Sequence, residues 1–107
     1  MKNMNMKKIE ITEHARQRLM ERMPEINIKQ YNQIVQCARY KGKTEYDLRK
    51  ENPIFANALL KRFRRDNSTE IRVYKDHVFV FFGNNRHART LKTVVNIPPH
   101  ILALQNT

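Results

Sequence analysis

The chain of 107 residues carries 21 lysines and arginines against 10 acidic residues, so its formal net charge is +11. A chain of this length is expected to form one domain, 1–107, because a split would leave pieces too small for independent cores. No apolar run approaches the roughly 20 residues that cross a bilayer, so we expect no membrane partner. The single cysteine, Cys37, cannot form an internal disulfide, which favours a cytoplasmic protein, and the polar residues 1–6 are expected to be disordered.

Three amphipathic helices are predicted in the first two thirds of the chain, over residues 13–23, 28–40 and 53–65. Each follows a residue whose side chain can cap a helix N-terminus: Thr12, Asn27 and Asn52. The segment 44–51 is ambiguous between a short helix and a loop. Apolar residues at helical spacing predict the buried faces of the three helices. These residues are Ala15, Leu19, Met20, Met23, Ile28, Tyr31, Ile34, Val35, Ala38, Phe55, Ala56, Leu59, Leu60 and Phe63.

The hydrophobic pattern changes to alternation after Ser68, which indicates β-strands. Strands are predicted over 70–74, 77–82 and 89–97, with a short edge strand over 7–11, turns at 75–76 and 83–85, and a final helical turn over 100–104. The segment 77–82 is apolar on both faces, so it is expected to be the central strand. The sequence therefore predicts an α+β domain whose N-terminal helices pack on one face of a C-terminal antiparallel β-meander of three to four strands.

The positive charge is distributed unevenly along the chain. No acidic residue follows Asp76, whereas Arg86, Arg89 and Lys92 do. A polyanion would bind such a surface and release its counterions, so we expect a nucleic-acid partner, RNA or DNA. The alternatives are a basic surface that only maintains solubility, one that meets an anionic membrane surface, and one that is covered by an acidic partner protein.

Signatures of cofactor and metal sites are missing from the sequence. With two glycines in the chain, neither a phosphate-binding P-loop nor a dinucleotide-binding loop can be built. One cysteine and four scattered histidines offer no zinc-ligand spacing. We therefore expect neither a cofactor nor a metal.

A histidine and arginines at four-residue spacing form a polar stripe on the first predicted helix: His14, Arg18 and Arg22. Cleavage of RNA without a metal requires a base that deprotonates the 2′-hydroxyl and cations that hold the phosphorane. His14 as the base and Arg18 as the phosphate holder fit these two roles. The alternative is structural, with His14 near the helix cap and the arginine stems covering the edge of the core.

The segment Thr-Glu-His-Ala-Arg-Gln-Arg, residues 12–18, opens a first helix that is followed by further helices and by a strand bearing Arg89 and Thr93. In this order of elements the chain resembles the barnase/EndoU/colicin/RelE-like superfamily of small ribonucleases and toxins. More narrowly, it resembles a bacterial and phage branch with a His-Ala-x-x-Arg first helix. The resemblance implies a metal-independent endoribonuclease of toxin type, neutralised by an antitoxin or immunity protein, with His14 as the acid/base group and Arg89 and Thr93 as the basic and hydroxyl residues of the sheet.

Positions 89 and 93 lie four apart on one predicted strand and are therefore expected to face the same side, together with Leu91, Val95 and Ile97. Arg72 and Tyr74 share another strand face and could hold a phosphate and stack a base. The remaining predicted nucleic-acid contacts are Arg22, Lys61, Arg62, Arg64, Arg65, Arg86 and Lys92. The same residues would also serve a non-enzymatic nucleic-acid-binding protein of a phage or mobile element.

Overall fold

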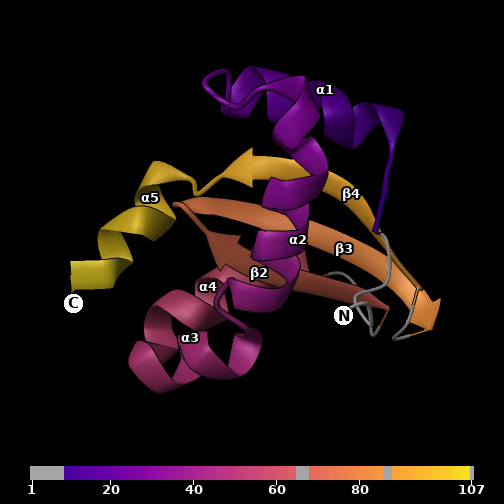
Figure 1. Ribbon diagram of the computed structural model, residues 1–107. Helices are drawn as coiled ribbons and strands as arrows, with labels where there is room; N and C mark the ends of the chain where they lie inside the picture. The colour runs from indigo at the N-terminus through magenta and orange to yellow at the C-terminus, as the bar shows by residue number, and fades with distance from the viewer. Residues whose placement is uncertain (1–8, 65–67, 86–87, 107) are drawn as a thin grey trace.

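The computed structural model describes residues 9–64, 68–85 and 88–106, without the side chains at 84–85, 88–89 and 106 (Figure 1). In chain order the elements are β1 (Glu10–Ile11), α1 (Glu13–Arg22), the 3₁₀ helix η1 (Ile28–Gln30), α2 (Tyr31–Lys41), α3 (Glu45–Glu51), α4 (Pro53–Phe63), β2 (Thr69–Tyr74), β3 (His77–Asn85), β4 (Ala88–Asn96), α5 (Pro99–Leu102) and the 3₁₀ helix η2 (Ala103–Asn106). The predicted disordered segment 1–6 lies outside the described residues.

The four strands form one mixed sheet in the order β1-β4-β3-β2. The hairpins β2–β3 and β3–β4 are antiparallel, as predicted, and the two-residue β1 joins the edge in parallel to β4. The predicted α+β fold, with helices first and the strand meander last, is confirmed. The sheet is mixed rather than purely antiparallel because β1, from the N-terminal part of the chain, runs parallel to β4.

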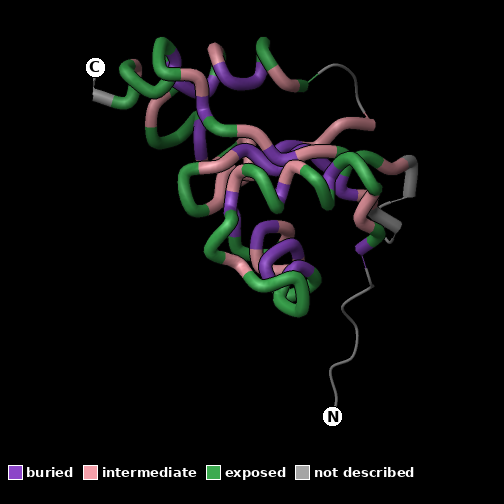
Figure 2. The backbone as a smooth tube through the Cα atoms, turned by 90° about the horizontal axis from the view of Figure 1, so that it is seen from above, coloured by how far each residue is buried: buried purple, intermediate pink, exposed green. Residues whose placement is uncertain are grey.

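Helices cover both faces of the sheet rather than one. α1 and α2 pack on one face, against Phe79 and Phe81 of β3. α4 and α5 pack on the other face, against Val78 and Val80 of the same strand. Seen from above, the sheet lies between these two helical layers, with buried positions along its middle (Figure 2). The prediction of helices on a single face was wrong because a strand that is apolar on both sides needs cover on both sides.

Side-chain caps define where the helices begin. Thr12 Oγ1 accepts a hydrogen bond from the Ala15 N–H, and Asn52 Oδ1 accepts one from the Phe55 N–H. Asn27 caps the 3₁₀ helix that leads into α2. Thr44 and Asp47 form a reciprocal capping box. This capping box explains why the ambiguous segment 44–51 is helical.

Two residues assigned to buried helix faces are exposed: Met20 at 53% and Ile28 at 60%. Ile28 lies in the three-residue η1 helix, whose tighter turn breaks the helical spacing that aligned it with the core residues of α2.

The predicted turn at 83–85 is also wrong, since β3 continues to Asn85. Among the described residues, no helix is long and apolar enough to span a membrane.

Gly42 ends α2, but for a different physical reason from the usual left-handed glycine cap. Its backbone is extended, with φ −66° and ψ 157°. A Cβ at this position would collide with the carbonyl oxygen of Ala38 and press on the side chain of Arg72. Glycine is therefore needed chiefly because a Cβ would strike the last turn of α2 itself, and β2, where Val73 pairs with Lys43, leaves little room on the other side.

Candidate nucleic-acid interface

A β-bulge in β4 decides which side chains reach each face of the sheet. Val80 pairs with Thr93 and Phe81 pairs with Leu91, so Lys92 is an extra residue on β4. Leu91 therefore faces the layer of α1 and α2, whereas Thr93 faces the layer of α4 and α5. The prediction that Leu91 shares the face of Thr93 was wrong, because simple alternation fails at the bulge.

A groove opens on the α4 side of the sheet, beside the bulge. We call it the β4 groove; it is lined by Arg62, Phe63, Thr69, Val80, Lys92, Thr93 and Val95. Val80, Val95 and Phe63 provide an apolar floor. The hydroxyls of Thr69 and Thr93 and the exposed cations of Arg62 and Lys92 are its polar groups. No acidic residue appears among the described residues that line it.

Within the described part of the chain, the two cations of the groove lie beside aromatic rings, and neither pairs with a carboxylate. The Arg62 guanidinium lies 5.9 Å from the centre of the Phe63 ring, and Lys92 Nζ lies 5.9 Å from the centre of the Phe82 ring. These distances are at the outer limit of a cation–π contact, so the cations are held only weakly. Both can therefore shift toward an anion in the groove at low cost.

The predicted catalytic residues are not assembled in one place. His14 lies exposed in the first turn of α1, on the helical layer opposite the β4 groove, whereas Thr93 is half-buried within that groove. The side chain of Arg89 lies outside the description. The structure therefore places His14 and Thr93 in two different depressions, although α1 begins beside the bulge, where Thr12 bonds to the Lys92 carbonyl.

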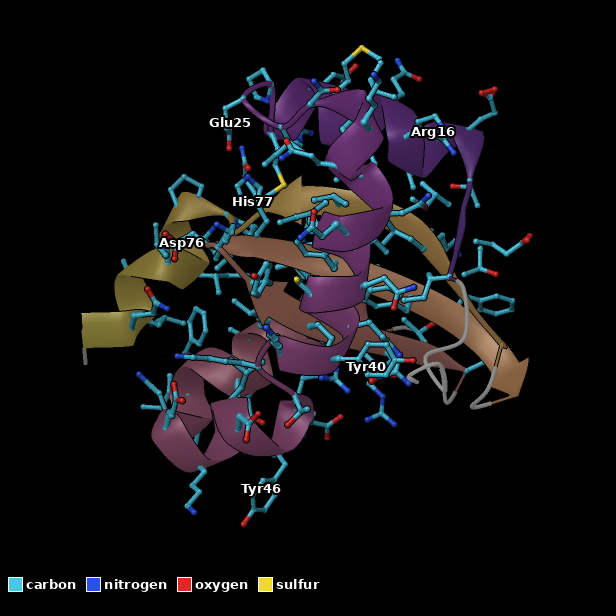
Figure 3. All side chains as sticks on the ribbon, in the orientation of Figure 1. Arg16, Glu25, Tyr40, Tyr46, Asp76 and His77 are labelled. Atoms are coloured by element: carbon cyan, nitrogen blue, oxygen red, sulfur yellow. The ribbon has the colours of Figure 1, made fainter. Side chains whose placement is uncertain are left out.

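Around His14 the arginine neighbours differ from the predicted stripe. Arg18 forms an ion pair with Glu21 at 2.6 Å, and this hydrogen bond lowers the pKa of the Glu21 carboxyl. Arg22 is half-buried, and within the described part of the chain its Nε has no hydrogen-bond partner. A shallow depression beside His14 is instead lined by Glu13, Arg16, Gln17 and Met20. Arg16, which projects from α1 in Figure 3, is thus the guanidinium that shares a surface with His14.

Arg72 and Tyr74 share a strand face, but that face lies under α2 and cannot stack a base. Arg72 donates to Glu70 at 2.9 Å and to the carbonyl of Gly42 at 3.2 Å. Tyr74 packs edge-on against Phe79, with ring centroids 6.4 Å apart. Burial raises the pKa of Tyr74, and the neighbouring Cys37 adds to this effect. Both side chains are half-buried against neighbouring residues of the fold.

Arginines and glutamates form a compensated cluster at the lower end of α2 in Figure 3, near the labelled Tyr40 and Tyr46. Glu70 pairs with Arg39 at 3.6 Å and with Arg72 at 2.9 Å. Glu45 pairs with Arg64 at 3.3 Å and with Arg49 at 3.2 Å. The predicted phosphate contact Arg64 is thus already engaged by a carboxylate.

The other predicted nucleic-acid contacts fall into two groups. Lys61 and Arg62 are exposed on α4 and line a shallow depression against α5, together with His100 and Leu104. Arg65 and Arg86 lie outside the described residues. Of all the predicted contacts, the structure therefore brings Arg62, Lys92 and Thr93 together, in the β4 groove.

The sequence patterns did not predict a role in this region for three residues: Thr69, Phe63 and Phe82. Thr69 precedes the predicted strand by one residue, and Phe63 was assigned to the core. Phe82 belongs to the apolar run of β3, yet it is 41% exposed and is not part of the core under α4 and α5. Phe82 is the last residue of the apolar run and is followed by Gly83, and this position was the sequence signal that the strand could become exposed there.

Comparison with protein-family models, with curated proteins and with solved structures finds no match. Within residues 9–64, 68–85 and 88–106, no group of three or more His, Cys, Asp and Glu side chains is placed to hold a metal ion.

Proposed function

We propose that the chain is a nucleic-acid-binding protein that holds the phosphate backbone, of RNA in the first instance, in the β4 groove. The observation that carries this proposal is the convergence of Arg62 and Lys92 with the hydroxyls of Thr69 and Thr93 on a groove whose described lining has no acidic residue. Guanidinium, ammonium and hydroxyl groups are the usual side-chain donors to phosphate oxygens. The net charge of +11 supports the same partner.

The ion pairs of four arginines elsewhere in the fold support the assignment of phosphate binding to this groove. Arg18, Arg39, Arg64 and Arg72 all lie within ion-pair distance of a glutamate. A phosphate would have to displace those carboxylates before it could bind there. Among the described residues of the β4 groove, it would displace weak contacts with aromatic rings. Phosphate binding is therefore favoured in the β4 groove over the arginine–glutamate cluster.

Binding to a short RNA is expected to weaken steeply as salt is raised. Each phosphate neutralised on a single strand contributes about −0.7 to the slope of log affinity against log salt. The dissociation constant measured by fluorescence anisotropy across a salt series gives this slope. A flat line would contradict the proposed function, since phosphate contacts release counterions.

Removing the two cations of the groove is expected to weaken binding by at least about tenfold. The double variant Arg62→Gln, Lys92→Gln should also make the salt slope shallower by roughly 1.4, the share of two phosphate contacts. The matched control is Lys29→Gln, Lys41→Gln, which removes the same charge from exposed positions at the two ends of the η1–α2 segment. Equal losses in both double variants would show that net charge, rather than the groove, binds the nucleic acid.

A second candidate function is metal-independent RNA cleavage of toxin type at His14. The observation that favours it is the exposed imidazole in the first turn of α1, with Arg16 and Gln17 lining the same depression. An imidazole beside a guanidinium supplies a base and a phosphate holder. Incubation of RNA with the protein in excess chelator tests this activity. A toxin of this kind would be neutralised by an acidic inhibitor protein that covers its basic surface.

The proposed site of action is the cytoplasm. The lone Cys37 supports it, because a protein without disulfides suits a reducing compartment. Expression of a fluorescent fusion and fractionation of the cells test this location.

A further inference from the structure

Phe82 is a large aromatic side chain that the fold leaves uncovered beside the β4 groove. Along β3, Val78, Val80 and Phe82 alternate onto the same face, with exposed fractions of 0%, 6% and 41%. Residues of α4 and α5 pack in the core of this face with Val78 and Val80, and Phe82 is not a member of that core. The ring of Phe82 therefore meets solvent.

The neighbours of Phe82 are the residues of the proposed phosphate site. Across the sheet, Phe82 pairs with Thr69 on one side and with Thr90 on the other. Thr69 lines the β4 groove, and Lys92, which lines it as well, places its ammonium near the ring. The bulge at Lys92 directs this side chain to the face of Phe82. An exposed ring thus lies between two hydroxyls and one loosely held cation.

We propose that Phe82 is a base-stacking subsite and that the ligand of the β4 groove is a single strand rather than a duplex. This inference rests on the proposed function. In a duplex the faces of the bases are stacked on one another, so a protein ring cannot reach them. A single strand exposes base faces, and aromatic residues beside a basic groove are the common way to bind it. With a base stacked on Phe82, Lys92 moves from the ring to the adjoining phosphate.

The first test compares the affinities for a twelve-nucleotide RNA strand and for its duplex. At equal salt, the protein is expected to bind the single strand at least about tenfold more tightly. Phe82→Ala should weaken single-strand binding by roughly fivefold to 150-fold, the usual effect of losing one base–aromatic stack, and leave the salt slope unchanged. Phe82→Leu, which keeps an apolar side chain without a ring, should show the same loss.

A second test reads the stacking itself. The chain has no tryptophan, so Phe82→Trp introduces a single fluorophore. Its emission is expected to be quenched by the single strand and not by the duplex, with affinity retained. Unchanged emission, or wild-type affinity of Phe82→Ala for the single strand, would overturn the inference. If the salt-dependent binding persists in that case, the proposed function still stands; if the wild-type protein binds no nucleic acid, the proposed function itself has failed.

Discussion

Replacing Phe79 with alanine is expected to lower the free energy of unfolding by about 4 kcal/mol, in line with the usual cost of truncating a buried phenylalanine. Phe79 is fully buried on the internal strand β3, in the core cluster under α1 and α2. The truncation removes its packing against that cluster and its edge-on contact with Tyr74. A domain of this size is stable by only about 5–15 kcal/mol, so the loss is a large fraction of the total. Urea denaturation followed by circular dichroism measures it.

The control for this prediction lies in the same strand. Phe82→Ala removes an equal side chain from a position that is 41% exposed, and it should cost less than about 1.5 kcal/mol. A small loss of stability in Phe82→Ala would also show that a binding defect of this variant does not come from misfolding. Equal destabilisation by the two substitutions would mean that the described packing of β3 is incorrect.

If the protein cleaves RNA, His14→Ala is expected to reduce the rate by at least about two orders of magnitude, the usual contribution of a positioned acid/base group. Cleavage should spare DNA, because the reaction begins with the 2′-hydroxyl, and it should keep its full rate in excess chelator. The melting temperature should hardly change, since His14 is exposed. Single-turnover cleavage of an end-labelled RNA measures the rate.

Two further variants distinguish an active site at His14 and Arg16 from the predicted one that includes Thr93 of the sheet. Arg16→Ala should also slow cleavage, whereas Thr93→Ala should leave the chemical step unchanged, since Thr93 lies on the opposite side of the sheet from α1. Full activity of His14→Ala, or activity that is lost with EDTA and restored by magnesium, would contradict the His14 mechanism. RNA binding without cleavage would leave the protein as a nucleic-acid-binding protein alone.

The sequence by itself determined the order and type of most of the elements. Thr12, Asn27 and Asn52 mark where the helical segments begin, because their side chains bond to backbone N–H groups only a few residues away. The doubly apolar segment 77–82 correctly predicted the buried strand β3. These signals succeed because caps, helical spacing and alternation depend on local geometry. The apolar residues on both sides of this segment also indicated helical cover on both faces of the sheet, although helices were predicted on one face.

The tertiary structure alone decided the composition of the candidate site. The bulge at Lys92 depends on how β4 pairs with β3, and pairing between strands leaves no mark in the spacing of one strand. That single extra residue places Leu91 and Thr93 on opposite faces of the sheet, and it lets Lys92 line the β4 groove together with Thr93. Likewise, Arg72 and Arg62 look equally basic in sequence. Arg72 lies beneath α2 and is bonded to Glu70, whereas Arg62 lines the β4 groove. Long-range packing makes this difference, because it decides which cations meet a carboxylate.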